Sequence, residues 1–439
     1  MTVPHPSRGL GPGFGRLFAA NISSSLGDGI ARTALPLLAA RLTDDPLAIS
    51  AVAALSLLPW LFFAIPSGIV VDRIDRRRAL GIAQAVRVLL GLALVALVAT
   101  GTLTIWWLYV VIFVYGAFET LYDGAVRAVV PSLVRAADLP RANGRIEAGE
   151  QVVQNFVAGP LTSALFAVAV VLPLGLNVAA FAFAGVLAIL LPRAASGREH
   201  AADATAAGGS LADDAPWYRQ FATGYRFIRS TPVLWKLWLV SSANGVFMSM
   251  STATLVLWVL GPLQVPEAWF GVFMLAAAVG GLASSFAAAP LARRFGSGAV
   301  MASMMVLCAV ATLAMGLVPI AWAGAVLFGI SAGAVTIWNI LVISLRQALI
   351  PRHLLGRAHG TWRTLLWGTM PLGSLLGGLL GRFGLGIPFV VGGGVALLIG
   401  LAYFRFLRGL PDPADAAILG RSGAPADIPL PGAEPSPEP

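Results

Sequence analysis

The chain has 439 residues, of which 58% are hydrophobic and only 11% are charged, and its mean hydropathy is +0.83. Soluble domains carry about a quarter of their residues as charges, so this composition excludes an ordinary soluble enzyme and indicates a polytopic membrane protein. The net charge is +9. Because the arginines lie in short turns between apolar runs and not on one basic face, we expect no nucleic-acid partner.

Twelve apolar runs follow one another along the chain, each long enough to cross a bilayer as a helix. They predict an all-α membrane protein with twelve transmembrane helices. The runs lie near residues 17–40, 48–71, 79–100, 104–127, 144–168, 172–191, 234–258, 268–290, 298–318, 321–345, 359–380 and 385–407.

Arginine placement predicts the orientation of these runs. Thirteen arginines fall in the turns after the second, fourth, eighth and tenth runs, and the opposite turns carry only Arg41 and Arg382. Positive charge accumulates on the cytoplasmic side of membrane proteins. We therefore expect both termini in the cytoplasm and a multi-pass protein of the plasma membrane, which in a bacterium is the cytoplasmic membrane.

A polar interruption divides the runs into two halves. Residues 1–192 and 233–410 are the expected six-helix bundles, and residues 193–232 link them. The second part of this linker places Trp217, Phe221, Tyr225 and Ile228 at helical spacing with arginines elsewhere around the helix, which predicts an amphipathic helix on the inner membrane surface. The Pro-, Ala- and acid-rich residues 411–439 are expected to be a disordered cytoplasmic tail.

The turn between the second and third runs, residues 68–78, packs six charges into eleven residues. Its four arginines mark the cytoplasmic side. The turn resembles the Gly-x-x-x-Asp-Arg-x-Gly-Arg-Arg signature of the major facilitator superfamily, a large group of twelve-helix transporters. Asp75 replaces the second glycine, a departure that is common in the enterobactin-exporter-like and multidrug efflux branch. The matching residues are Gly68, Asp72, Arg73, Arg76 and Arg77.

This resemblance implies a fold and a conformational device. Members of the superfamily consist of two six-helix bundles that rock around a central site. By position, Asp72 would hold the start of the eleventh run and Arg76 would bridge to Asp123 in the fourth run. Together they would form a latch that breaks in every transport cycle. The alternative is that the charged turn only anchors the topology.

The first run carries polar side chains at steps of three and four, which places them on one helical face. An ionisable group inside a span costs on the order of 2.5–3.5 kcal/mol, so each embedded acid is a candidate for function. Asp28 either carries a proton or stays in a fixed ion pair with Arg32, one turn away. We expect Asn21 and Ser24, on the same face, to line a wet cavity.

The fourth run repeats this pattern with Tyr115, Glu119 and Asp123 at steps of four. No cation precedes Glu119 on its own helix. Glu119 therefore either exchanges protons or pairs with Arg32 across the helix interface, and the sequence leaves both possibilities open. The predicted proton-coupling residues are accordingly Asp28, Glu119 and Arg32.

The remaining embedded polar and aromatic residues predict a cavity for a partly apolar organic substrate. The fifth run contains Gly159-Pro160, a partial match to the glycine-rich fifth helix of antiporters in the superfamily, which favours export. The second half is nearly free of embedded acids. The cavity candidates beyond the first run are Tyr115, Gln151, Gln154, Asn155, Asn244, Trp338, Asn339, Arg363 and Trp367.

No stretch has the spacing of a cofactor or metal site. The four histidines lie in tails, the central loop or one turn, and Lys236 has no glycine-rich loop before it. We expect no cofactor, no bound metal and no enzymatic activity. The expected partners are a small-molecule substrate, protons and the lipid bilayer, and one chain that holds both halves favours a functional monomer.

The leading hypothesis is a secondary transporter that exports a small organic molecule, drug- or siderophore-like, by proton antiport. A facilitator or an importer on the same fold is the alternative within this class, because no sequence feature fixes direction. A membrane-embedded enzyme and a transport-dead scaffold are the alternatives outside it. The enzyme hypothesis lacks a nucleophile motif and an intramembrane histidine.

Overall fold

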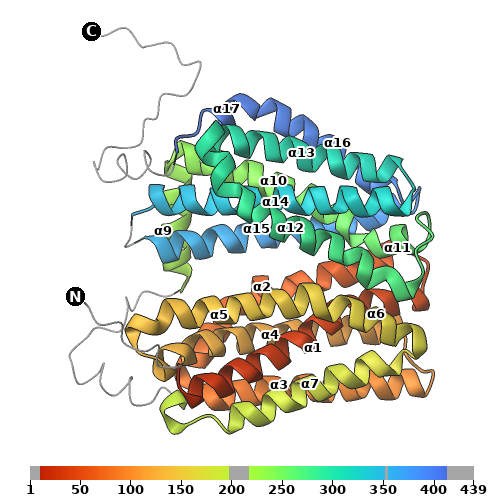
Figure 1. Ribbon diagram of the computed structural model, residues 1–439, viewed down its shortest axis with the longest axis vertical. Helices are drawn as coiled ribbons and strands as arrows, with labels where there is room; N and C mark the ends of the chain where they lie inside the picture. The colour runs from red at the N-terminus through yellow and green to blue at the C-terminus, as the bar shows by residue number, and fades with distance from the viewer. Residues whose placement is uncertain (1–9, 197–216, 352–353, 413–439) are drawn as a thin grey trace, which may run out of the picture. The chain divides into compact units, whose positions relative to one another are not determined.

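The computed structural model describes residues 10–196, 217–351 and 354–412 (Figure 1). Every regular element within these ranges is helical, as the apolar runs predict. Residues 197–216 of the central linker lie outside the described residues, as does the tail beyond residue 412, for which we predict disorder.

The chain divides into two compact units. Unit 1 comprises Met1–Thr43, Leu55–Asp214 and Pro266–Val272, and unit 2 comprises Asp44–Ala54, Ala215–Val265 and Phe273–Pro439. Two helices, α2 (Pro46–Arg73) and α12 (Glu267–Phe295), contribute residues to both units. The units therefore follow the two halves of the sequence except at the beginnings of these two helices.

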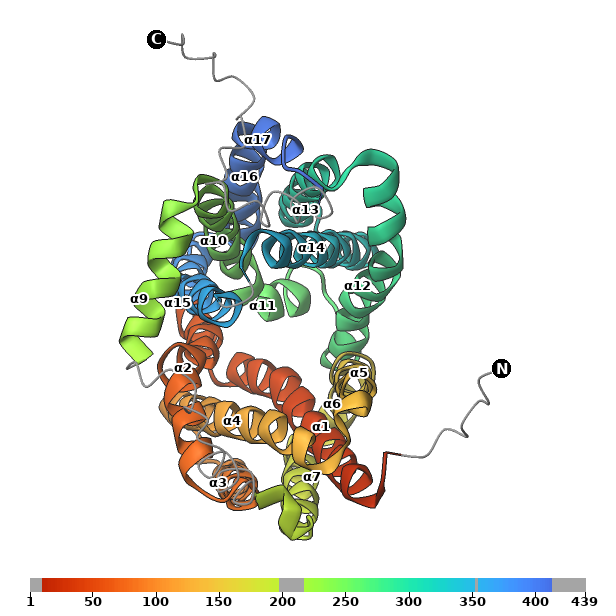
Figure 2. The same ribbon diagram turned by 90° about the vertical axis from the view of Figure 1, so that its left-hand side faces the viewer.

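Unit 1 is built from the helices of the first half of the chain. Their bounds are α1 (Pro12–Leu42), α3 (Arg76–Ala99), α4 (Ile105–Leu133), η1 (Ala136–Asp138), α5 (Leu139–Val152), η2 (Val153–Ala158), α6 (Gly159–Val168), α7 (Val171–Ile189) and η3 (Arg193–Ser196). Helix α1 packs against α7, α4 and the continuous α5–η2–α6 segment, and α3 packs against α4 and α7 (Figures 1 and 2). Leu17, Leu80 and Val129 are completely buried in the apolar core between these helices.

Unit 2 contains the helices of the second half. Their bounds are α9 (Trp217–Ser230), α10 (Pro232–Ala253), α11 (Leu255–Leu260), α13 (Ser297–Leu317), α14 (Ala321–Leu349), α15 (Leu355–Gly381), α16 (Ile387–Ala402) and α17 (Phe404–Arg408). Helix α10 packs against α15 and α16, and α13 packs against α14 and α16 (Figure 2). Leu234, Leu237 and Met301 are completely buried in the core of this unit.

Eight helices of the described part are long and apolar enough to cross a membrane, namely α2, α3, α4, α7, α12, α13, α14 and α15. The other four predicted runs also coincide with helix: they form α1, the α5–η2–α6 segment, α10 and α16. Helix α16 has only 16 residues, and α1 carries embedded charges. All twelve apolar runs are therefore helical.

Glycines bring α10 and α15 into close contact, as the four-residue spacing of Gly373, Gly377 and Gly381 predicts. A Cβ atom built on Gly373 would collide with the carbonyl oxygen of Val246, and one on Gly377 would collide with that of Met250. The missing side chains thus let the backbones of the two helices touch.

Replacing Gly373 by alanine is expected to destabilise unit 2 by about 1–3 kcal/mol, because an added methyl group overpacks the contact with α10. The matched control is Gly360→Ala on the same helix, where a Cβ would have no neighbour within 4 Å. That control is expected to be neutral or slightly stabilising, since alanine favours helix over glycine. Thermal unfolding in detergent, followed by tryptophan fluorescence, compares the two variants, and equal midpoints would contradict the contact.

The amphipathic segment predicted in the linker is helical, and it forms α9. Its placement on the membrane surface stays a prediction, and α9 also packs against α15 and α10. Ile228 is completely buried, and the hydroxyl of Thr361 donates a hydrogen bond to the carbonyl oxygen of Phe221 at 3.2 Å. Tyr225, on the predicted apolar face, remains 38% exposed. The helix therefore buries part of its apolar face against protein.

Arg41 and Arg382, the two arginines in the turns predicted to face away from the cytoplasm, both pair with acids. In unit 1, Arg41 forms two hydrogen bonds with the carboxylate of Glu267, the one from Nε being 3.1 Å long. In unit 2, Arg382 donates two hydrogen bonds to Asp45, at 2.8 and 2.7 Å. These bonds hold the pKa of Asp45 below its usual range, so the pair is lost only as the pH falls through that lowered value.

Candidate functional site

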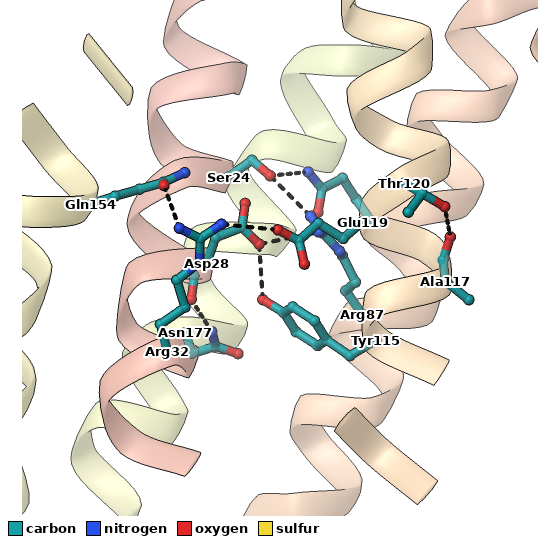
Figure 3. Close-up of polar contacts among 12 residues, drawn as sticks. Ser24, Asp28, Arg32, Arg87, Tyr115, Ala117, Glu119, Thr120, Gln154 and Asn177 are labelled. Atoms are coloured by element: carbon teal, nitrogen blue, oxygen red, sulfur yellow. Dashed lines mark hydrogen bonds and ion pairs between the residues drawn. The ribbon is translucent and has the colours of Figure 1, made fainter. Parts of the chain in front are cut away.

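A buried ion pair joins α1 to α3 (Figure 3). The side chain of Arg87 is completely buried, and its Nη2 atom lies 3.1 Å from Oδ1 of Asp28. The hydroxyl of Tyr115 on α4 donates a hydrogen bond to the same carboxylate oxygen at 3.2 Å. Nη1 of Arg87 donates to the hydroxyl of Ser24 at 3.1 Å. Three helices thus surround one carboxylate, and Asp28 pairs with Arg87 and not with Arg32.

Aromatic rings enclose the guanidinium of Arg87. Its central carbon lies 4.8 Å from the ring centroid of Tyr115, 5.6 Å from that of Tyr122 and 5.0 Å from that of Phe181. A cation over the face of an aromatic ring is attracted to it. Gln84, one turn before Arg87, is also buried and donates a hydrogen bond to the hydroxyl of Ser24 at 2.9 Å. The charge of Arg87 is therefore held entirely by protein groups.

A second ion pair lies beside the first and is more open (Figure 3). Nη2 of Arg32 lies 3.3 Å from Oε1 of Glu119, and Nη1 of Arg32 donates to Oε1 of Gln154 at 3.1 Å. The side chain of Arg32 is 59% exposed and that of Glu119 is 15% exposed. The alternative in which Glu119 finds Arg32 across the helix interface is thus the one observed. Gln154 reaches this pair from η2, a π-helical turn of the kind frequent at functional sites.

Asp123, one turn along α4 from Glu119, has no hydrogen-bond or ion-pair partner among the residues that the structure describes. The predicted bridge from Arg76 to Asp123 is not formed. Nη1 of Arg76 instead donates to the carbonyl oxygen of Ala128, near the end of α4, at 2.8 Å. The charged turn is therefore tied to α4 through the backbone of that helix. The side chains of Asp72 and Arg73 lie outside the described part.

The remaining residues of the charged turn have local roles. Asp75 caps α3, because its Oδ1 accepts a hydrogen bond from the backbone N–H of Arg77 at 2.9 Å. Nη2 of Arg77 donates to the carbonyl oxygen of Ile189 at the end of α7, at 2.7 Å. Capping gives a physical reason for an acid where the signature has glycine. A Cβ on Gly68 would meet nothing within 4 Å, so close packing does not explain the glycine there.

Amide side chains extend the polar network along α5. Asn21 on α1 donates a hydrogen bond to the carboxylate of Glu150 at 2.6 Å. Along the α5–η2 segment, Asn155 donates to Gln151 at 2.6 Å and Gln151 donates to Glu147 at 3.4 Å. The cavity candidates of the first and fifth runs therefore hydrogen-bond to one another or to charged and amide side chains of the same network.

The candidates in unit 2 lie in different environments. Trp338 is 7% exposed and belongs to the apolar core, so packing alone accounts for it, whereas the neighbouring Asn339 is exposed. The Oδ1 atom of Asn244 is buried without a hydrogen-bond partner. The guanidinium of Arg363 lies 4.6 Å from the ring centroid of Trp367. Arg363 and Trp367 are thus in contact with each other.

Sequence reasoning missed three residues of the network, Arg87, Gln84 and Asn177. Asn177 on α7 donates a hydrogen bond to the carbonyl oxygen of Gly27 at 2.6 Å. The signal for Arg87 was present, because an arginine in the middle of the apolar run 79–100 carries the same burial cost as an embedded acid. No comparable signal marks Gln84 or Asn177, since neutral amides are less costly to bury.

Relatives of known function resemble most of the chain. The multidrug efflux pump Tap of Mycobacterium tuberculosis (strain ATCC 25618 / H37Rv) is 26% identical over 385 residues, which cover 84% of this chain and 87% of that protein. Tap of Mycobacterium bovis (strain BCG / Pasteur 1173P2) matches to the same extent.

Solved structures share the fold at low sequence identity. The nucleoside transporter NupG aligns with a TM-score of 0.67 and 13% identity, over 90% of this chain and 99% of that one. A bacterial homologue of the iron transporter ferroportin, in its inward-facing state, aligns with a TM-score of 0.64 and 17% identity, over 89% and 98% of the two chains. The family model described as Major Facilitator Superfamily matches residues 17–367. The chain therefore belongs to the major facilitator superfamily, whose members are membrane transporters and not enzymes.

Proposed function

We propose that this secondary transporter exports a small, partly apolar organic molecule in exchange for protons. Similarity to a multidrug efflux pump over most of the chain supports export. The cluster of acids in unit 1 supports proton coupling, because a carboxylate inside a membrane protein is a common proton carrier. Residues Asp28, Glu119, Asp123 and Glu150 make up this cluster.

The observation that carries the proposal is the difference between the two ion pairs. Arg87 is completely buried, so protonating Asp28 would leave a buried cation without its counter-charge, which is costly. Arg32 is largely exposed, so water replaces Glu119 as its partner when Glu119 takes up a proton. We therefore assign proton exchange to Glu119, with Arg32 and Gln154 beside it. Asp28 and Arg87 form the fixed pair that positions α1 against α3.

In this proposal the charged turn anchors α3 to its neighbours within unit 1, the alternative to a latch. Arg76 and Arg77 tie the turn to backbone carbonyls of α4 and α7, so the start of α3 follows these helices when they move. Both termini lie in the cytoplasm. The distribution of arginines supports this orientation, since the turns on the opposite side carry only Arg41 and Arg382.

Proteoliposomes with an imposed pH gradient test the proposed function. Protein reconstituted with a pH-sensitive dye inside is exposed to a panel of fluorescent organic cations. We expect the addition of substrate to dissipate the pH gradient, because protons cross the membrane in exchange for it. We also expect the gradient to drive accumulation of the cation. Substrate movement that equilibrates without any effect of the gradient would contradict antiport and identify a facilitator.

A further inference from the structure

A second buried arginine lies in unit 2, far along the chain from the acids. Arg346, in the last turn of α14, is 5% exposed. Its Nη2 atom lies 2.7 Å from Nδ1 of His359 on α15, and its guanidinium carbon lies 4.3 Å from the ring centroid of Trp362. Trp362 is itself buried, at 2% exposure.

Arg346 differs from Arg87 in having no acid. No carboxylate in the described ranges pairs with it, and its Nε atom is buried with no hydrogen-bond partner. Buried charges in proteins are normally paired, because removing an ion from water without compensation is expensive. A neutral histidine and an aromatic face compensate it only in part.

We propose that Arg346 and His359 form a binding site for an oxyanion of the phosphate type. A guanidinium presents a fixed fork of N–H donors that matches phosphate oxygens, and here Nε–H is unused. Since the Nδ1 atom of His359 faces the cation, that nitrogen accepts and the other ring nitrogen carries the proton, ready to donate. His359 is exposed, so the buried arginine is reached from its side.

The phosphate has two sources with the same chemistry. One is the headgroup of an anionic lipid, since basic pockets between helices on the cytoplasmic side bind such headgroups, and α14 ends on the side predicted to be cytoplasmic. The other is a free phosphate or phosphate-bearing solute. Neither source depends on the proposed transport cycle.

Thermal unfolding of the purified full-length protein tests the site. One arm titrates inorganic phosphate against chloride at equal ionic strength in neutral detergent. The other compares nanodiscs of phosphatidylcholine with nanodiscs that also contain phosphatidylglycerol. We expect phosphate or phosphatidylglycerol to raise the Tm of the wild-type protein, because a ligand that binds only the folded state stabilises it.

Three variants test whether Arg346 and His359 are responsible for the rise in Tm. Arg346→Gln is expected to weaken the apparent affinity at least tenfold, and His359→Gln severalfold. Arg293→Gln is the matched control, because it removes the same charge from an exposed arginine of the same unit and is expected to respond like wild type. Arg346→Gln removes an unpaired cation, so it is expected to fold, and His359→Gln tests the site independently.

The two measurements distinguish a soluble phosphate from a lipid headgroup, and they show which results would contradict the proposal. A response to phosphate in detergent identifies a site for a soluble phosphate group, and a response to phosphatidylglycerol alone identifies a lipid site. The proposal is overturned if wild type responds to neither probe, or if Arg346→Gln and wild type respond equally.

Discussion

Replacing Arg87 by glutamine is expected to destabilise unit 1 by about 3–5 kcal/mol, the usual effect of removing one partner from a buried ion pair. The variant leaves the carboxylate of Asp28 buried, with the hydroxyl of Tyr115 as its remaining donor. Three aromatic rings would also lose the cation that they enclose. The midpoint of thermal unfolding in detergent, and the yield of monodisperse protein, measure the loss.

A double-variant cycle shows whether the loss comes from the uncompensated charge. Arg87→Gln combined with Asp28→Asn removes both charges together, and we expect it to recover at least half of the stability lost by Arg87→Gln alone. Arg32→Gln is the control, because its partly exposed pair with Glu119 is hydrated and is expected to contribute less than about 1 kcal/mol. Equal effects of Arg87→Gln and Arg32→Gln would contradict the distinction between a fixed and an open pair.

Replacing Glu119 by glutamine is expected to abolish accumulation driven by the pH gradient while leaving substrate exchange in place. Glutamine keeps the shape and a hydrogen-bonding oxygen for Arg32, but it cannot take up a proton. We expect gradient-driven uptake to fall at least 100-fold, the usual scale for loss of a proton-transferring group. Exchange of labelled for unlabelled substrate across proteoliposomes without a gradient is expected to stay within about threefold of wild type, since it needs no net proton movement.

The matched control is Glu147→Gln, the same substitution at an exposed residue of α5 whose side chain accepts a hydrogen bond from Gln151. It is expected to preserve both gradient-driven uptake and exchange. Gradient-driven uptake that persists in Glu119→Gln would contradict the assignment of proton exchange to Glu119. Asp123, which has no ion-pair partner in the described structure, would then be the next candidate.

The fold was predictable because hydrophobic length decides it. A run of about 20 apolar residues satisfies its backbone only as a helix inside a bilayer, so every predicted run became helical. The boundaries were less predictable: α4 continues to Leu133 and α5 begins at Leu139, beyond the apolar runs. Helices extend past the bilayer wherever capping and packing allow, and hydropathy does not predict these ends.

The candidate site was predictable only in part. Helical spacing placed Asp28 and Glu119 on the inward faces of their helices, because the residues that share a face can be read from the sequence of a single helix. Their partners come from other helices. From the sequence, Arg32 was a possible partner of both acids, and nothing in the sequence decided between them. Arg87 takes Asp28 because α3 packs beside α4 and α7 and brings its middle turn to α1.

The sequence by itself determined the class of protein, the number of apolar segments and the family, since composition, length and the charged turn are local properties. The tertiary structure alone decided which charges meet. It paired Asp28 with Arg87, gave Arg76 a backbone carbonyl in place of Asp123, and left Arg346 buried without an acid among the residues that the structure describes. The physical reason is that an ion pair between helices depends on rotations and shifts of whole helices, which are set by packing over many residues and written in no single stretch of the chain.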